Sequence, residues 1–190
     1  MRYLPLAVAF LCLAYPRISD ANEFQVELET LASSRVAALA AAPEVIAAVL
    51  DHNRKSASLD ADAIEGLDQV WRAEVDSIVQ PTIDAMMSNS LSQFLARQQE
   101  ASGGLFTEIF VMDAKGLNVG QSELTSDIWQ GDEAKWQDTF LKGRDSRHIS
   151  DIEQDDSTQT IQSQISLPVV DPSTGTPIGA ITVGINIERL

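Results

Sequence analysis

The sequence predicts an α+β fold in which a helical N-terminal half packs on an antiparallel sheet of about five strands. Residues 22–102 carry apolar side chains mostly at helical spacing, whereas residues 103–190 contain short apolar runs broken by turn residues. The chain has 190 residues, 44% hydrophobic and 22% charged, which is enough to bury one globular core. We therefore expect the helical segment 22–102 and the sheet segment 103–190 to form one domain.

The first predicted helix spans Glu23 to Ala42 and is rich in alanine. Its larger apolar residues recur mostly at helical spacing, and the alanines allow close packing along one side of a sheet. The helix has more apolar surface than one packing face needs, which predicts a homodimer through its other face. Pro43 suits the first turn of a second helix that continues to about Asp51.

Three further signals divide the rest of the helical half. Asp60 is placed to cap a third helix, and Pro81 ends or kinks that helix. A last helix from about Leu91 to Glu100 stops at Gly103-Gly104, because glycine readily adopts the conformation that ends helices. The third helix carries one apolar stripe, a pattern typical of a helix with one buried face: Ile64, Leu67, Val70, Trp71, Val75 and Ile78.

Two hairpins are predicted in the sheet segment. The apolar run Ile109–Met112 breaks at Asp113–Gly116 and resumes over Leu117–Ser122, as two strands do around a glycine-containing turn. Thr160–Val170 and Pro177–Ile187 form the second pair of strand-like runs. A polar segment with a short helix beginning near residue 132 separates the two hairpins.

One of these strands has two chemically different faces. Gln162, Gln164 and Ser166 alternate with apolar residues along Thr160–Val170, so one face belongs against the core. The polar face either lines a pocket or meets solvent, and the alternation does not decide between them. Pro168 suggests an edge position or a strand end, because proline cannot donate a hydrogen bond to a neighbouring strand.

The first 21 residues have the pattern of a secretory signal peptide. Arg2 supplies positive charge, Leu4–Ala14 is apolar, and Ser19-Asp20-Ala21 ends in a small residue, which predicts cleavage after Ala21. The apolar run is about half of the ~20 residues that a membrane-spanning helix needs. We therefore expect a periplasmic or secreted protein. Cys12 is the only cysteine, so the mature chain would contain no thiol nucleophile and no disulfide.

Charge and motifs exclude several functional classes. The formal net charge of −15 repels phosphate backbones and anionic lipid headgroups, so nucleic acid is not an expected partner. The sequence has no G-x-S-x-G elbow, no glycine-rich phosphate loop and no H-E-x-x-H motif. His52 and His148 are expected to be surface or hydrogen-bonding residues. These features indicate a non-catalytic protein without a cofactor.

The order hairpin, helical excursion, hairpin resembles the extracytoplasmic PAS-like sensor domains called Cache or PDC domains. The resemblance lies in VMDAKGLNVGQS as the first hairpin, TSDIWQGDEAKW as the insert, and ISLPVVD with PIGAITVGINI as the second hairpin. It implies a PAS-like fold and recognition of a small extracellular ligand in signal transduction. Receptors of this family continue after the last strand into a transmembrane helix. Because this sequence ends at Leu190, we expect a stand-alone domain that signals through a membrane-bound partner.

The resemblance also indicates where a ligand would lie. In Cache domains the ligand lies between the concave face of the sheet and the segment that links the hairpins, which here contains Trp129, Lys135 and Trp136. Indole offers apolar area and an N–H donor, and the ammonium group offers a counter-charge, which suits a small organic acid. The alternative is that both tryptophans pack the short helix onto the sheet.

The amino-acid-sensing branch of the family uses an Arg-x-Trp-Tyr element, then a Tyr-x-Asp, then an aspartate in the last strand. Trp136 fits the tryptophan, but Ala134 and Gln137 replace the arginine and tyrosine, which argues against amino-acid sensing. Asp155 fits the middle aspartate, with Glu153 in place of its tyrosine, and Asn186 replaces the last aspartate. The residues predicted to bind the ligand are therefore Trp129, Lys135, Trp136, Glu153, Asp155 and Asn186.

Two other functions remain open from the sequence. One is an interaction or dimerisation module with a vestigial pocket. The other is a divalent-cation binder, because oxygen-bearing side chains alternate through Asp151, Glu153, Asp155 and Ser157. The pattern departs from a calcium loop, since Asp156 stands at the turn glycine and Gln162 at the bidentate glutamate, so a solvated acidic loop is favoured.

Overall fold

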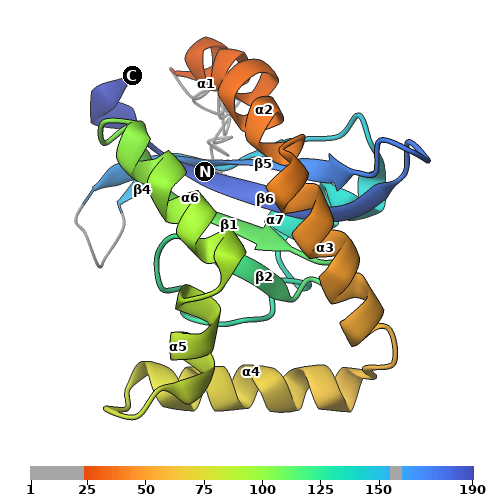
Figure 1. Ribbon diagram of the computed structural model, residues 1–190. Coiled ribbons are helices and arrows are strands. Elements are labelled where there is room, and N and C mark those ends of the chain that lie inside the picture. The colour runs from red at the N-terminus through yellow and green to blue at the C-terminus, as the bar shows by residue number, and fades with distance from the viewer. Residues whose placement is uncertain (1–23, 155–159) are drawn as a thin grey trace, which may run out of the picture.

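The computed structural model describes residues 24–154 and 160–190, which form helices on both sides of one antiparallel sheet (Figure 1). The predicted signal peptide, residues 1–21, and the predicted ligand residue Asp155 lie outside the described residues. Every predicted segment of the remaining chain forms an element of the expected type.

The N-terminal helices pack across one face of the sheet. The first is continuous, made of α1 (Gln25–Leu31), a π-helical turn η1 (Ala32–Val36) and α2 (Ala37–Ala40). It is followed by α3 (Pro43–Ser56), which begins at its proline as predicted but extends beyond Asp51. Among the described residues no single helix is long and apolar enough to cross a membrane. The pair Gln25–Ala40 and Pro43–Ser56, bent by 62°, reaches that length and apolar composition only when the two helices are counted together.

The predicted homodimer requires an apolar outer face on α1–α2. Its buried side chains, Leu28, Val36 and Leu39 among them, face the sheet. Its exposed residues are polar or small apart from Val26. The apolar surface inferred from the sequence is therefore used inside the domain, and the homodimer stays a prediction.

Three more helices complete the helical half: α4 (Ala61–Val75), α5 (Pro81–Met87) and α6 (Ser90–Ala101). The Asp60 carboxylate caps α4 by accepting a hydrogen bond from the Ala63 backbone N–H at 2.9 Å, as predicted. Pro81 begins α5, and α6 ends before Gly103 and Gly104, which both have positive φ.

The predicted apolar stripe of α4 is only partly correct, because Trp71, Ile64 and Val75 pack into one apolar cluster and the other three residues do not. Leu67 and Val70 are 38% and 48% exposed, and Ile78 lies beyond the end of the helix and is fully exposed. The residues that α4 buries are Asp68, Trp71 and Glu74, spaced three apart. Polar contacts to loops hold this helix, and hydropathy alone does not reveal such a face.

The sheet has the strand order β2-β1-β6-β5-β3, with β4 also paired to β5, and every pairing is antiparallel. The two hairpins lie side by side because β1 of the first pairs with β6 of the second. More than 60 residues separate β1 from β6 in the sequence. The strands are β1 (Phe106–Met112), β2 (Asn118–Gln121), β3 (His148–Ile149), β4 (Glu153–Gln154), β5 (Ile161–Val170) and β6 (Pro177–Asn186).

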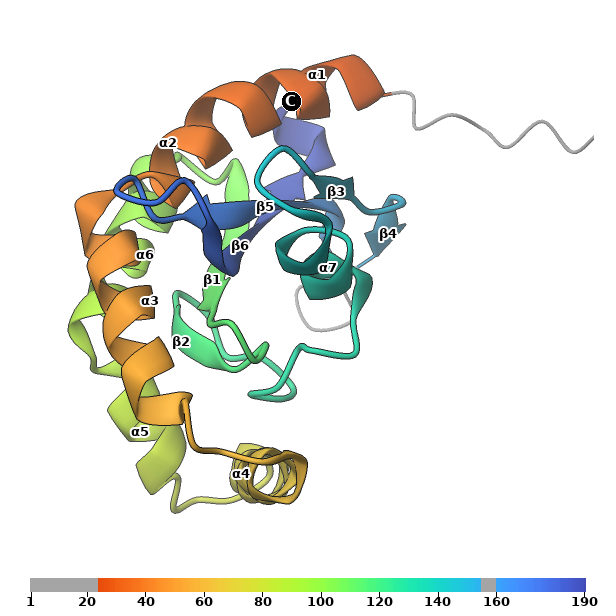
Figure 2. The ribbon, with the colours of Figure 1, turned by 90° about the vertical axis from the view of Figure 1, so that its right-hand side faces the viewer.

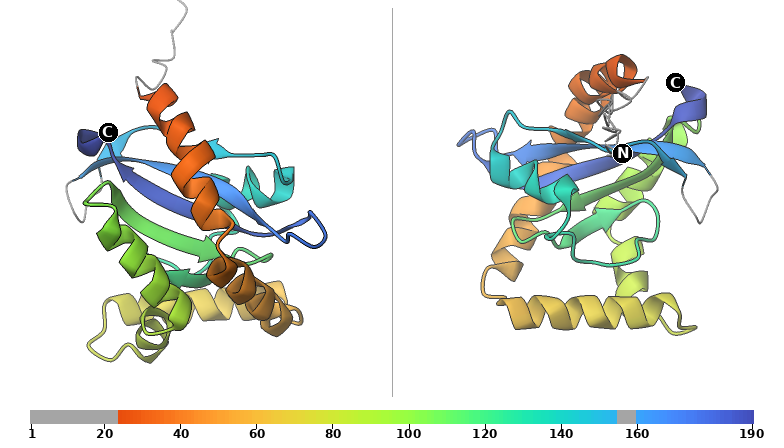
Figure 3. Two further views of the ribbon diagram at one scale, coloured as in Figure 1. Left: turned by 45° about the horizontal axis from the view of Figure 1, so that its top comes forward. Right: turned by 180° about the vertical axis from the view of Figure 1, so that it is seen from behind.

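The two faces of the sheet are covered by different parts of the chain (Figure 3). On one face, alternate residues such as Ile109, Ile165 and Val183 form the main core with α1–α3 and α6. On the other face, the link between the hairpins carries α7 (Ala134–Gln137) and η2 (Phe140–Lys142). The chain ends in η3 (Ile187–Arg189). The order hairpin, helical insert, hairpin is the one that the resemblance to Cache domains implies.

The turn of the first hairpin is fixed by the end of α3. Asp113 is fully buried, and its Oδ2 lies 2.9 Å from His52 Nδ1 and 2.6 Å from the Ser56 hydroxyl that donates to it. Its Oδ1 accepts from the backbone N–H groups of Lys115 and Leu117 at 2.8 and 3.0 Å. His52 is thus a hydrogen-bonding residue, as predicted. The turn that follows Asp113 is held to the end of α3 by these hydrogen bonds.

Candidate functional site

A cavity of about 480 Å³ lies on the second face of the sheet, under the link between the hairpins. We call it the sheet cavity. Its floor comes from β1 and β5, one wall comes from residues 124–130, and α7 with the residue before it closes the other side. It is lined by Glu108, Phe110, Leu124, Thr125, Ser126, Asp127, Gln130, Glu133, Lys135, Gln162 and Gln164.

The floor of the sheet cavity is polar and internally hydrogen-bonded. Gln164 donates through Nε2 to Glu108 Oε1 at 2.8 Å, and Thr107 donates through its hydroxyl to Gln162 Oε1 at 2.6 Å. An irregular register between Phe106 and Glu108 accompanies this arrangement on β1. The polar face of β5, which the sequence left open between pocket and solvent, therefore lines a cavity.

Asp127 is the most constrained carboxylate of the cavity wall. Its Oδ2 accepts from Arg72 Nη2 at 3.2 Å, and its Oδ1 accepts from the side-chain amide of Gln130. Burial raises the pKa of Asp127, and the charge of nearby Glu133 raises it further, against the lowering effect of Arg72. The wall thus holds a carboxylate whose ionisation is disfavoured by burial and by Glu133, although Arg72 and Gln130 donate to it.

Lys135 brings the one ammonium group among the residues that line the cavity. Its side chain is 16% exposed, and Nζ lies 2.9 Å from Glu133 Oε2 and 3.3 Å from Gln130 Oε1. The same nitrogen lies 5.4 Å from the centroid of the Phe110 ring, a favourable position over an aromatic face. Lys135 therefore faces the cavity, as its sequence-based assignment requires.

Helix α4 clamps the wall formed by residues 125–130. Trp71 donates through Nε1 to the Thr125 carbonyl at 2.9 Å, and Asp68 Oδ1 accepts from the backbone N–H groups of Ile128 and Trp129 at 3.0 and 3.1 Å. Arg72 joins Asp68 Oδ2, 2.6 Å from its Nε, to Asp127. These contacts explain why α4 buries polar residues, and they fix the position of the cavity wall.

The two predicted tryptophans lie away from the lining of the sheet cavity. Trp136 is partly buried against the cluster of Phe110, Met112 and Ala180 and stacks on Phe140 with ring centroids 5.1 Å apart. Trp129 lines a different cavity next to α4 and donates through Nε1 to the Lys115 carbonyl at 2.8 Å. Trp129 and Lys135 therefore do not face one common space.

Glu153 and Asn186 lie beside the floor without lining it. Both pair with Gln162 across the sheet, Glu153 from β4 and Asn186 from β6. Glu153 is exposed, and Asn186 caps η3 by accepting from the Glu188 backbone N–H at 2.9 Å. Within residues 24–154 and 160–190, no group of three His, Cys, Asp or Glu residues is arranged to hold a metal ion.

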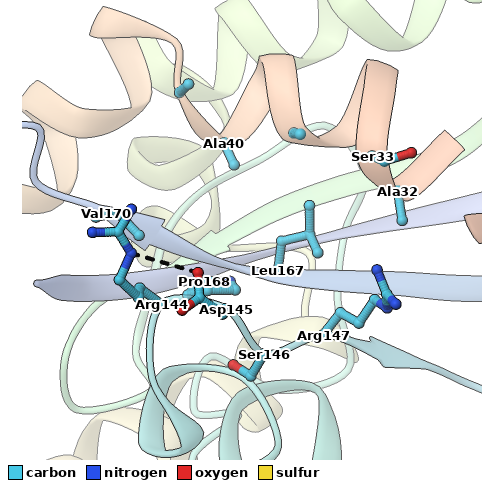
Figure 4. Close-up of a pocket in the computed structure, with 12 residues that line it drawn as sticks. Ala32, Ser33, Ala40, Arg144, Asp145, Ser146, Arg147, Leu167, Pro168 and Val170 are labelled. Atoms are coloured by element: carbon cyan, nitrogen blue, oxygen red, sulfur yellow. Dashed lines mark ion pairs between the residues drawn. The ribbon is translucent and has the colours of Figure 1, made fainter. Parts of the chain in front are cut away.

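A third cavity of about 300 Å³ lies between α1–α2 and β5, where Figure 4 shows Arg144 and Arg147 beneath a surface of small helical residues. Each guanidinium has a carboxylate partner: Arg144 Nε lies 3.5 Å from Asp145 Oδ1, and Arg147 Nε lies 2.9 Å from Glu29 Oε2. Both cations of this cavity therefore already have partners.

Comparisons with known proteins returned similar solved structures only. No family model matches the sequence, and no curated protein matches it. The sensor domain of the V. cholerae histidine kinase DctB matches with a TM-score of 0.44 and 16% identity, over 87% of this chain and 55% of that chain. The ligand-binding domain of the Pseudomonas aeruginosa PAO1 amino acid chemoreceptor PctC, in complex with GABA, matches with a TM-score of 0.42 and 14% identity, over 88% and 62%.

A third structure is the ligand-binding domain of the Campylobacter jejuni chemoreceptor Tlp3 in complex with 4-methylisoleucine, with a TM-score of 0.40 and 12% identity, over 90% of this chain and 62% of that chain. This chain thus spans less than two thirds of the length of all three. They are sensor or ligand-binding domains, the class to which the sequence resemblance points.

Proposed function

We propose that this protein is a non-catalytic, extracytoplasmic sensor module whose sheet cavity binds a small molecule that carries an amino group. The observation that carries the proposal is the convergence of charged side chains on one cavity. Glu108, Asp127 and Glu133 contribute carboxylates, and Lys135 contributes one ammonium group. The amides of Gln162 and Gln164 supply further donors and acceptors on the floor.

The charges around the cavity favour an amine-bearing ligand over the small organic acid expected from the sequence. A small organic acid would need Lys135 as its counter-charge, but that ammonium already lies 2.9 Å from Glu133. A purely anionic ligand would also face the carboxylate of Asp127, and like charges at close range repel each other. A ligand with an ammonium group relieves this repulsion, and a second, acidic group on the same ligand would compete with Glu133 for Lys135.

The open cavity favours a binding module over a vestigial one. A volume of about 480 Å³ falls within the range of about 300–1,000 Å³ typical of small-molecule pockets. A clamp of hydrogen bonds from α4 holds one wall in place, which reduces the cost of ordering the site on binding. Signal transduction and a membrane-bound partner belong to the proposal through the Cache resemblance.

A matched panel tests the ligand class. Protein comprising residues 22–190 is titrated with GABA, butyrate and butylamine, which share a four-carbon chain and differ in their charged groups. Calorimetry should detect GABA or butylamine and not butyrate, and binding should raise the melting temperature by mass action. Equal or tighter binding of butyrate would contradict the proposal.

The site itself is tested with two variants. Asp127→Asn keeps the side-chain shape but removes the charge that meets the ligand amine. Because a hydrogen bond to a charged group contributes ~1.5–3 kcal/mol, the affinity should fall about ten- to a hundred-fold. Asp62→Asn makes the same chemical change on the exposed surface of α4, outside the cavity, and should leave the affinity unchanged.

A further inference from the structure

A second cavity, of about 610 Å³, lies between α4 and the turn of the first hairpin. Figures 1 and 2 show α4 crossing the end of the molecule next to β2, at a distance from the main helical layer. We call this space the α4 cavity. It is lined by Leu59, Asp60, Ala61, Ile64, Glu65, Asp68, Arg72, Lys115, Trp129 and Asp132. It shares none of these residues with the sheet cavity.

The indole of Trp129 forms a fixed aromatic wall in the α4 cavity. Its Nε1 donates to the Lys115 carbonyl at 2.8 Å, and its ring lies so close to Gly131 that a Cβ there would be 2.5 Å from Nε1. A Cβ on Gly116, whose φ is +81°, would in turn lie 2.5 Å from the Gly131 Cα. The absence of a side chain at Gly131 therefore lets the indole take this position. Its orientation is set before any ligand arrives, which reduces the entropic cost of binding.

The remaining walls combine apolar side chains with an excess of negative charge. Leu59 and Ile64 are partly buried beside Trp129. Four carboxylates line the cavity against two cations, and both cations have partners: Arg72 bonds Asp68 and Asp127, and the Lys115 ammonium donates to the Leu59 carbonyl at 2.6 Å. The remaining carboxylates of the lining are Asp60, Glu65 and Asp132.

We propose that the α4 cavity is a second small-molecule site, which takes an organic cation with an aromatic or aliphatic body. Indole and apolar side chains favour the body of such a ligand by excluding water from it. A cationic group is attracted to the face of an indole ring and to carboxylates at the rim. This proposal does not depend on the function of the sheet cavity, because a different set of residues carries it.

The test uses phenethylammonium as the probe and 3-phenylpropionate as its anionic counterpart. Binding is followed by calorimetry and by the NMR signal of the Trp129 Nε1–H, assigned by its loss in Trp129→Phe. Phenethylammonium should shift this signal in a saturable manner, and 3-phenylpropionate should not. An unmoved Trp129 signal at saturation, or equal binding of the anion, would overturn the proposal.

Charge variants locate the bound cation. The double variant Glu65→Gln/Asp132→Asn should weaken phenethylammonium binding about ten-fold, because rim charges are partly screened by solvent. Asp62→Asn makes a similar change on the same helix but outside both cavities. This control should keep the affinity of the wild type. If Asp62→Asn lost as much affinity as the double variant, the loss would come from the change in net charge alone, and the proposed site would be refuted.

Discussion

At the scale of single residues, Asp113 is the clearest link between the helical half and the loops around the sheet cavity. Burial disfavours its charge, but the hydrogen bonds from His52, Ser56 and the backbone N–H groups of Lys115 and Leu117 outweigh burial and lower its pKa below the ordinary value of 3.8. The ionised carboxylate therefore stabilises the folded state. This contribution is fully present above about pH 4 and is lost as the pH falls through the lowered pKa.

The change Asp113→Ala should destabilise the protein by about 3 kcal/mol at pH 7, because it leaves several buried donors without an acceptor. The loss should shrink as the pH falls towards 2, where the wild-type carboxylate becomes protonated. Urea unfolding at a series of pH values measures both effects. A stability difference that stays constant over this pH range would contradict the role given to the charge.

Asp127 should behave in the opposite sense. Burial and the neighbouring charge of Glu133 raise its pKa, with Asp68 adding to this and Arg72 opposing it. Ionisation is then less favourable in the folded than in the unfolded state, and the resulting cost grows as the pH rises from the unfolded pKa to the raised folded pKa. Asp127→Asn removes this cost but also weakens the contact with Arg72, so its stability at pH 7 should stay close to that of the wild type while ligand affinity falls. Thermal melts that show clear destabilisation would mean that the contact with Arg72 outweighs the cost of burying the charge.

The sequence could predict only part of the site at this scale. The alternation in β5 placed Gln162 and Gln164 on one polar face, and the Cache resemblance selected Lys135, which lines the sheet cavity. Asp127 gave no signal, because its importance comes from Arg72, 55 residues away in the chain. Trp129 was predicted to line the same pocket as Lys135, but it lines the separate cavity next to α4, with its ring against Gly131.

At the scale of elements, α4 is the helix whose role the sequence did not disclose. Its start was predictable from Asp60, as were the start of α3 at Pro43 and the end of α6 before Gly103, whereas Pro81 begins α5 and does not end α4, which stops at Val75. Such signals act within one turn of the chain. The polar contacts that α4 makes depend instead on distant loop atoms, so the apolar part of its packing was expected and the polar clamp was not.

The clamp predicts a local effect of Asp68→Ala. Removing the acceptor of the Ile128 and Trp129 N–H groups should make the cavity wall open more often, without unfolding the sheet. A hydrogen bond to a charged group contributes ~1.5–3 kcal/mol, so exchange of these two amides should be about ten- to a hundred-fold faster. Hydrogen exchange followed by NMR measures it, with Asp62→Ala as the matched change on the same helix. Unchanged exchange would show that α4 does not hold the wall.

At the scale of the whole molecule, the resemblance to Cache domains accounts for the order of elements and for the position of the sheet cavity between the sheet and the link. The fold was predictable because hairpins, caps and alternation are local features, whereas the pairing of β1 with β6 joins strands that are far apart in the sequence. Export stays a prediction: N-terminal sequencing of protein from its native host should find Asn22 as the first residue. Retention of Met1 would contradict export by a cleaved signal peptide.

The central claim, that the sheet cavity binds an amine-bearing molecule, is tested most directly by a crystal structure of the protein with whichever of GABA and butylamine binds more tightly. The ligand ammonium should lie about 2.7–2.9 Å from a carboxylate oxygen of Asp127, the range of charge-assisted hydrogen bonds. If GABA is the ligand, its carboxylate should meet Lys135, with Glu133 displaced from that ammonium group. A ligand bound with full occupancy elsewhere, with the sheet cavity holding only water, would contradict the claim.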